Sequence, residues 1–153
     1  MHHVTLLCVG NLKFSWAKEA CDDYINRLKH SVKFELVELS TSKMSEPEKQ
    51  RGEESERMIE ALEKRSGVVW VLDERGKSIT SEQFSKELQI AKDRGDEVMF
   101  VLGGAYGLSD VVRKKGRLLS LSAMTLPHEL CRVVFLEQLY RAVEIGKKSG
   151  YHH

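Results

Sequence analysis

The stretch that decides the fold is VMFVLGGAYGLSDVVRKKGRLLSLSAMTLPHELCRVVFLEQLYRA, from Val98 to Ala142. It begins with a wholly apolar run, Val98 to Leu102, which predicts a buried strand. A glycine-rich turn follows, and a second strand-like run, Leu118 to Leu121, leads through the polar loop Ser122 to Pro127 into a long amphipathic helix. Loops that leave adjacent parallel strands form a ligand cleft in an open α/β sheet. Because these loops hold few reactive side chains, they predict a ligand that is bound largely by backbone groups.

Elsewhere in the chain, apolar runs alternate with stretches of helical spacing. Further strands are expected at His3 to Val9, Lys33 to Leu39 and Gly67 to Leu72. Helices are expected at Ser15 to Lys29, Pro47 to Lys64, Thr80 to Gly95, Leu108 to Lys115 and His128 to Lys147. This alternation of about five strands and five helices predicts a three-layer α/β sandwich with a mainly parallel sheet. Since there is no repeat or long linker, residues 1–153 are expected to form a single domain.

Local signals refine this outline. Ser15 has the side chain of an N-cap, and Asp73 to Lys77 is expected to be a turn. The apolar face of the last helix is wide for a small domain, so part of it is expected to bury against another subunit. The buried face of the first helix is expected to contain Trp16, Ala20, Tyr24 and Leu28.

Composition favours a soluble cytoplasmic protein. No apolar run approaches the roughly 18–20 residues needed to span a bilayer, and the start of the chain resembles a strand more than a signal peptide. Three cysteines without a C-x-x-C pair fit a reducing compartment. The net charge of +1 excludes RNA binding by global electrostatics, so any RNA contact must come from local basic patches. Each of the two candidate patches, taken alone, fits a solvated face better than a binding site. They are Arg113, Lys114, Lys115 and Arg117, and Arg141, Lys147 and Lys148 with the terminal histidines.

The candidate chemical groups are few, and each has a structural alternative. The turn Gly103 to Gly107 matches neither G-x-G-x-x-G nor a P-loop, so a nucleotide phosphate is not expected there. Ser122 and Thr125 lack a recognisable partner base, which favours hydroxyls that bind a ligand or cap their own loop. His128 could act as a general base or as a helix-start hydrogen bonder, and Arg132, one turn on, is expected to face the same cleft. No histidine spacing predicts a metal site.

Taken together, these segments resemble one family over nearly the whole chain. The matching segments are Val9-Gly10, Glu54-Ser55-Glu56, Leu72-Asp73, Gly76-Lys77, Leu102-Gly103-Gly104, Gly107-Leu108, Leu119 to Ser122, Met124 to His128, Arg132-Val133, Glu137 to Ala142 and Tyr151-His152. The chain resembles the ribosomal RNA large subunit methyltransferase H family, in the SPOUT superfamily of trefoil-knotted, S-adenosylmethionine-dependent methyltransferases. It departs from the family at His153, where a lysine or arginine is usual.

The resemblance implies a C-terminal trefoil knot, a homodimer, and a 23S rRNA pseudouridine methylated at ring nitrogen N3 within the assembled ribosome. It implies cofactor contacts at Leu72, Gly103, Leu121, Ser122, Ala123, Met124, Thr125 and Leu126. Arg132, His128 and His152 are the catalytic candidates, and Arg141, Tyr151 and His152 are the substrate-side candidates. The Tyr151-His152 tail is expected beside the cofactor of the partner subunit.

Two alternatives stay open. The substrate could be transfer RNA, or the chain could be a noncatalytic RNA-binding dimer that kept the fold. A bulky side chain at Gly103 is expected to abolish cofactor binding by filling the adenosine space.

Overall fold

A five-stranded sheet with helices on both faces forms the framework of the computed structural model, which describes residues 1–153. All strand pairs are parallel, in the order β2-β1-β4-β3-β5. The strands are β1 (His2–Val9), β2 (Val32–Leu39), β3 (Val68–Ser78), β4 (Val98–Leu102) and β5 (Arg117–Ser120). The helices are α1 (Ser15–Leu28), α2 (Pro47–Glu63), α3 (Ser81–Asp93), α4 (Asp110–Arg113) and α5 (His128–Lys147). The predicted three-layer, parallel α/β architecture is confirmed.

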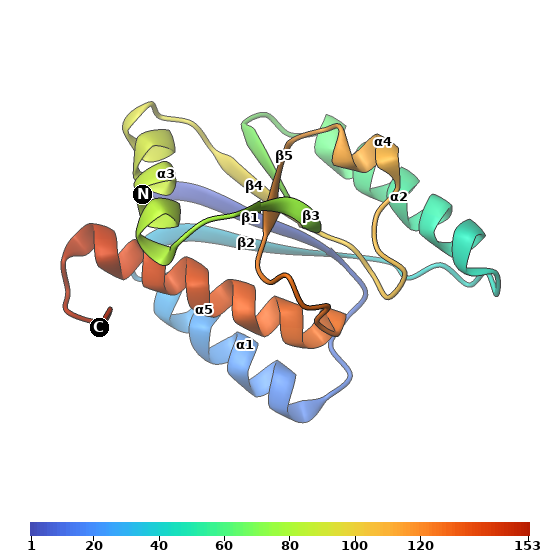
Figure 1. Cartoon of the computed structure of the whole chain (residues 1–153), viewed down its shortest axis with the longest axis horizontal. Helices are drawn as coiled ribbons and strands as arrows, with labels where there is room; N and C mark the ends of the chain where they lie inside the picture. The colour runs from blue at the N-terminus through green and yellow to red at the C-terminus, as the bar shows by residue number, and fades with distance from the viewer.

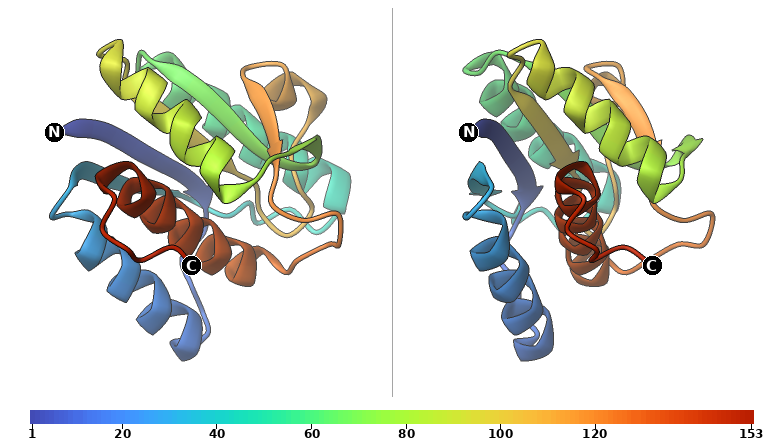
Figure 2. Two further views of the ribbon diagram at one scale, coloured as in Figure 1. Left: turned by 60° about the vertical axis from the view of Figure 1, so that its left-hand side comes forward. Right: turned by 90° about the vertical axis from the view of Figure 1, so that its left-hand side faces the viewer.

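The helices divide between the two faces of the sheet. Figures 1 and 2 show α1, α3 and α5 on one face and α2 with α4 on the other. Successive residues of β4 point to opposite faces: Phe100 and Leu102 join the core under α1, α3 and α5, whereas Met99 and Val101 join the core under α2 and α4. Because both faces are covered, the whole strand is apolar, as the sequence predicted.

Strand β3 is longer than predicted. The segment Asp73 to Lys77 continues the strand, so the prediction of a turn there is wrong. Pairing with β5 shifts in this segment, since Leu119 is the partner of both Leu72 and Lys77. Such a bulge bends the strand while it stays in the sheet. The bend places the first residues after Leu72 beside the loops that follow β4 and β5.

The start of α1 also differs from the prediction. Its N-cap position is Phe14, not Ser15, and the Glu129 carboxylate of α5 accepts hydrogen bonds from the backbone N–H groups of Lys13 (2.7 Å) and Phe14 (3.1 Å). A partner distant in sequence therefore replaces the local cap. The predicted inner face is only partly right: Leu28 is buried and Tyr24 packs against the core, but Trp16 is half exposed. The Trp16 ring stacks on Phe14 with centroids 5.8 Å apart. The residues that α1 buries are Ala17, Cys21 and Leu28.

Helix α5 has the predicted bounds and lies between α1 and α3 (Figure 1). Phe135, Leu136 and Leu139 are fully buried against the sheet. None of the helices combines the length and apolar character needed to cross a bilayer.

Candidate functional site

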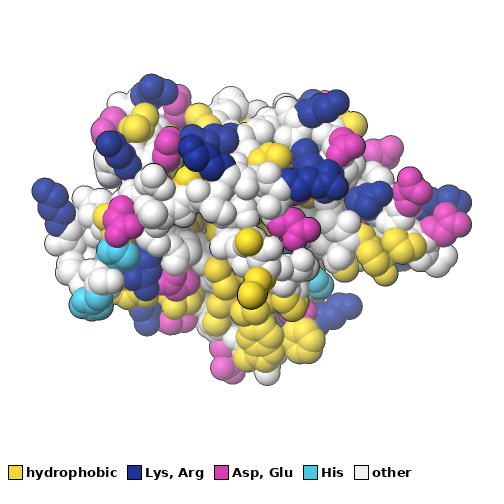
Figure 3. All heavy atoms as spheres, in the orientation of Figure 1, with side chains coloured by type: hydrophobic (Ala, Val, Ile, Leu, Met, Phe, Trp, Pro, Cys, Tyr) yellow, Lys and Arg dark blue, Asp and Glu magenta, His cyan; other side chains and the backbone are white.

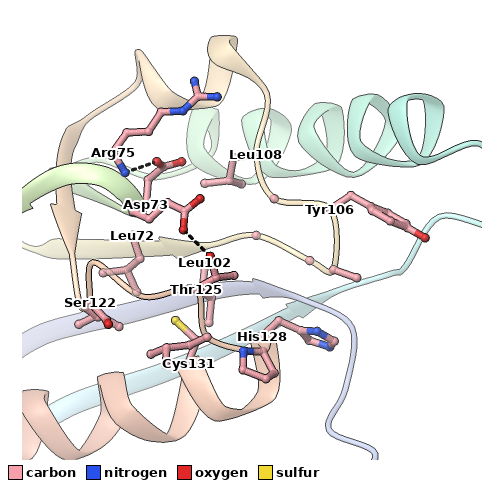
Figure 4. Close-up of a pocket in the computed structure, with 18 of the residues that line it drawn as sticks. Leu72, Asp73, Arg75, Leu102, Tyr106, Leu108, Ser122, Thr125, His128 and Cys131 are labelled. Carbon is pink, nitrogen blue, oxygen red and sulfur yellow. Dashed lines mark hydrogen bonds between the residues drawn. The ribbon is translucent and has the colours of Figure 1, made fainter.

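A cavity of about 670 Å³ lies at the carboxyl ends of β3, β4 and β5. Its size falls within the roughly 300–1,000 Å³ of small-molecule sites. Three segments form most of its lining: Leu72 to Arg75 at the bulge of β3, Leu102 to Leu108 after β4, and the loop from β5 into the first turn of α5. Arg51 of α2 and Arg113 of α4 complete it. Figure 4 shows side chains from all three segments converging on one hollow. The cleft predicted from the loops after β4 and β5 is therefore confirmed as a feature of the fold.

The glycine turn after β4 forms one wall of the cavity. The N–H of Gly107 donates to the carbonyl of Gly104 (3.0 Å), and Gly107 has φ of +79°, a conformation that favours glycine. A Cβ atom on Gly103 would lie 2.8 Å from Cγ of Leu108 and 3.0 Å from the carbonyl carbon of Gly107. A side chain at Gly103 would therefore also collide inside the turn, against residues that line the cavity.

Helix α2 holds this turn from outside, through two polar residues that the sequence marked only as part of a family-matching segment. Glu54 and Ser55 are each only 3% exposed. Ser55 Oγ accepts from the N–H of Ser109 (3.2 Å), and a Cβ on Gly104 would lie 2.7 Å from Glu54 Oε1. Glu54 Oε2 accepts from the N–H of Ser42 (3.0 Å), while Oε1 is buried without a hydrogen-bond partner. The signal in the sequence was their position on the inner stripe of α2 with Met58.

A network of charged and polar groups forms the wall that β3 supplies. Arg113 Nε donates to Asp73 Oδ2 (2.7 Å), and Asp73 Oδ1 accepts from the N–H of Arg75 (2.8 Å). Burial lowers the pKa of Arg113, but hydrogen bonds and the charges of Asp73 and Asp110 outweigh burial and raise the pKa overall. Thr125 Oγ1 donates to Glu74 Oε2 (3.0 Å), a bond drawn in Figure 4. The carboxylates at the cavity are therefore engaged by protein groups.

The first turn of α5 contributes His128 and Cys131 to the cavity. Burial raises the pKa of the Cys131 thiol to about 11. The thiol is therefore protonated near neutral pH and is a poor nucleophile.

Arg132 does not face this cavity, so that prediction is wrong. Its side chain is 3% exposed and runs toward the ends of β1 and β2. There it donates to Glu38 Oε2 (2.6 Å) and to the carbonyl of Gly10 (2.9 Å). These two acceptors, unseen in the helical spacing, draw the guanidinium away from His128.

The predicted cofactor residues come together, with one exception. Ala123 is exposed and does not line the cavity. The predicted residues that line it are Leu72, Gly103, Leu121, Ser122, Met124, Thr125 and Leu126.

The predicted substrate-side residues form a separate cluster at the other end of α5. Arg141 bonds to Nδ1 of His152 (3.1 Å), and its guanidinium carbon lies 4.9 Å from the centre of the Tyr151 ring. His152 Nε2 lies 2.8 Å from Glu82 Oε1 on α3. Along α5, His128 and Arg141 are separated by about 20 Å at the helical rise of about 1.5 Å per residue. Within one chain, the tail and the cavity are therefore apart.

Fold and cavity together define a parallel α/β protein with a cavity of small-ligand size at the carboxyl ends of its strands. No group of three or more His, Cys, Asp or Glu side chains is arranged to hold a metal ion. Residues 2–152 match a family model described as "Predicted SPOUT methyltransferase". The chain belongs to the SPOUT methyltransferase family.

Relatives and solved structures agree with this membership. The chain is 39% identical to the "Ribosomal RNA large subunit methyltransferase H" of Pelobacter propionicus, over 97% of each protein. It is 42% identical to the protein of the same name from Desulfovibrio desulfuricans, over 96% of this chain and 95% of the relative. A probable methylase family protein from Haemophilus influenzae shares the fold, with a TM-score of 0.61 at 10% identity, over 99% of this chain and 71% of that one.

Proposed function

We propose that the chain uses S-adenosylmethionine to methylate N3 of a pseudouridine in 23S ribosomal RNA, within the assembled ribosome. The observation that carries the proposal is the near full-length identity, 39% and 42%, to relatives named ribosomal RNA large subunit methyltransferase H. The cavity described above supports it, because its position matches the loops that the family resemblance assigns to the cofactor. We further propose that residues 1–153 act as one domain in the cytoplasm.

The residues of the cavity fit S-adenosylmethionine. The glycine turn leaves backbone groups accessible, and apolar side chains such as Leu72 and Leu121 line the hollow beside polar Asp73 and Thr125. When bound, this cofactor supplies a methyl group that its sulfonium already activates for transfer. The protein then needs mainly to orient the reactants, which suits a site whose only thiol is protonated. The proposed contacts are the lining residues Leu72, Gly103, Leu121, Ser122, Met124, Thr125 and Leu126, with Ala123 completing their loop.

Loss of the N3 proton from the base is the acid–base step that the protein must assist. His128 lines the cavity and is one candidate acceptor; His152 of the tail is the other. Arg132 keeps a proposed role only as a positioning residue, since its guanidinium is bound to Glu38 and Gly10. It holds the first turns of α5, and thereby His128, against the ends of β1 and β2.

We propose that the active form is a knotted homodimer in which the tail of one chain reaches the cavity of its partner. The separation of Arg141 and His152 from the cavity of their own chain supports this arrangement. Figure 3 shows hydrophobic side chains gathered over the N-terminal end of α1 and the neighbouring loop. Phe14 (55% exposed), Trp16 (50%) and Met124 (79%) are exposed hydrophobic residues of these segments. A second copy that covers this surface would remove it from water.

The test is methyl transfer from labelled S-adenosylmethionine to intact ribosomes, separated subunits and tRNA, followed by mapping of the labelled nucleoside. We expect label in methylpseudouridine of large-subunit RNA. Label only in tRNA would contradict the substrate. Absence of both transfer and cofactor binding would favour the noncatalytic RNA-binding dimer.

A further inference from the structure

Building on the proposed methylation of RNA, we infer that the outer side of the cavity is an RNA contact formed by Arg51 and Tyr106. The Arg51 guanidinium binds a backbone phosphate beside the target nucleotide, and the Tyr106 ring stacks on an adjacent base. Both residues line the cavity, one from α2 and one from the glycine turn. Neither belongs to the segments through which the chain resembles its family.

Arg51 is a cavity-lining cation without a protein partner. It is partly buried, yet no carboxylate lies within ion-pair distance and it makes no hydrogen bond to protein. The other two arginines of the cavity are paired: Arg113 with Asp73 and Asp110, and Arg75 with Asp110 at 3.7 Å. Elsewhere in the chain only Arg94 lacks a carboxylate partner, and it is exposed. An arginine that lines a cavity without a carboxylate partner has its donors free for an anionic ligand, so its position favours one.

Tyr106 supplies the second, independent observation. Its side chain lies at the tip of the glycine turn, 48% exposed, although it is a large aromatic residue. Figure 4 shows the ring at the edge of the cavity, on the opposite side from Leu72 and Ser122. An exposed aromatic ring and a free cation on the lining of one cavity are the groups with which proteins bind single-stranded nucleic acid, through base stacking and phosphate contact.

The backbone segments that carry Arg51 and Tyr106 are joined by buried contacts. Arg51 lies one helical turn before Glu54 and Ser55, which pack against Gly104 and bind the N–H of Ser109. Tyr106 lies between these two anchor points of the turn. Buried contacts therefore fix the backbone that carries Arg51 relative to the backbone that carries Tyr106.

Charge at the cavity favours an anion on this side. Asp73 is neutralised by Arg113, and Glu74 accepts from Thr125 on the opposite wall. The net charge of the whole chain is only +1, so attraction of RNA must be local. A free arginine at the mouth of the cavity provides that local attraction where the target base must enter.

The test compares Arg51→Gln with Arg94→Gln, which removes the same charge from the other unpaired arginine, outside the cavity. Cosedimentation with ribosomes over a series of salt concentrations measures binding, calorimetry measures S-adenosylmethionine affinity, and methyl transfer gives KM for ribosomes and kcat. We expect Arg51→Gln to raise the ribosome Kd and KM about tenfold and to reduce the slope of log K against log salt by about 0.7–0.9, one phosphate contact. Cofactor affinity should stay within about twofold, and Arg51→Lys should restore the salt slope.

Tyr106 is tested in the same assays. Tyr106→Ala should raise the KM for ribosomes about tenfold without changing the salt slope, since stacking is not a charge contact. Tyr106→Phe should behave as wild type because it keeps the ring.

A wild-type KM and salt slope in Arg51→Gln, or equal losses in Arg94→Gln, would overturn the inference while leaving the methyltransferase proposal intact. A change of oligomeric mass with Arg51→Gln would instead assign Arg51 to a subunit contact. If wild-type protein neither binds nor methylates ribosomes, the proposed function itself fails.

Discussion

At the scale of single residues, Gly104 is the position where the cavity depends most directly on the absence of a side chain. A Cβ there would meet Glu54 Oε1 at 2.7 Å, and Glu54 is fixed because its other oxygen binds the N–H of Ser42. We expect Gly104→Ala to displace the glycine turn at an overpacking cost of about 1–3 kcal/mol. The Kd for S-adenosylmethionine, measured by calorimetry, should rise at least about fivefold.

Gly52 offers the matched control on α2. Nothing lies within 4 Å of its would-be Cβ, and its backbone is helical. Gly52→Ala should therefore leave cofactor affinity unchanged and stabilise the fold by about 0.5–1 kcal/mol. Equal cofactor affinity in both variants would show that the turn tolerates a side chain at Gly104.

Arg132 is the residue whose assigned role changes most between sequence and structure. Its removal leaves the Glu38 carboxylate and the Gly10 carbonyl without their donor. Breaking a buried pair costs about 3–5 kcal/mol, and the 35% exposure of the Glu38 side chain reduces our expectation to about 2–3 kcal/mol for Arg132→Ala. Urea unfolding measures this loss of stability. The control is Lys64→Ala, which breaks an exposed ion pair and should leave the free energy of unfolding within about 0.5 kcal/mol of wild type. If Arg132→Ala kept wild-type stability but lost methyl transfer, Arg132 would act in the reaction and not only in positioning.

At the scale of elements, Glu129 joins the first turn of α5 to the start of α1. Burial raises its pKa, but the N–H donors of Phe14 and Lys13 outweigh burial, so the pKa lies below its ordinary value. A lowered pKa means that this link stabilises the fold above the ordinary carboxyl pKa and loses its contribution as the pH falls through the lowered value.

Glu129→Gln tests the link. Charge-assisted hydrogen bonds contribute about 1.5–3 kcal/mol each, and a neutral amide oxygen keeps part of this. We expect the variant to be about 1–2 kcal/mol less stable than wild type at pH 7, by urea unfolding. The difference should shrink below the ordinary carboxyl pKa of about 4.3 and vanish in stronger acid. A difference that stays constant down to pH 2 would show that the charge of Glu129 does not stabilise the fold.

The same elements show how far the sequence predicts this protein. The limits of β4 and α5 were predictable because hydrophobic period and burial agree along their whole length. The extension of β3 past Leu72, the cap of α1 by Glu129, and the direction of Arg132 were not, because partners distant in sequence determine each of them. The cavity was predicted from its loops, whereas the burial of Glu54 and Ser55 was not, because polar residues on a charged helix suggest exposure.

At the scale of the whole molecule, the apolar surface at Phe14 and Trp16 bears on the proposed dimer. Two stacked aromatic rings, each half exposed, are unusual in a monomer. If a second copy covers them, Trp16→Lys should convert the dimer to a monomer at micromolar concentration, as measured by light scattering, because a charge would be buried at the interface. Exposed Val111→Lys on α4 is the control and should remain dimeric. If Trp16→Lys formed a dimer with the affinity of wild type, the interface would lie elsewhere.

In the proposed dimer the tail of one chain completes the site of its partner, and this arrangement can be tested by complementation. Deletion of Tyr151 to His153 should abolish methyl transfer but leave cofactor binding, because the cavity contains no residue of the tail. Gly103→Val should abolish cofactor binding, because its side chain collides with Leu108. In a heterodimer of the two variants, the intact cavity of one chain meets the intact tail of the other. Mixing them after partial denaturation and refolding should therefore restore about a quarter of wild-type activity, by random pairing of two symmetric sites. If the tail served the cavity of its own chain, every heterodimer would lack a complete site, and the mixture would stay as inactive as each variant alone.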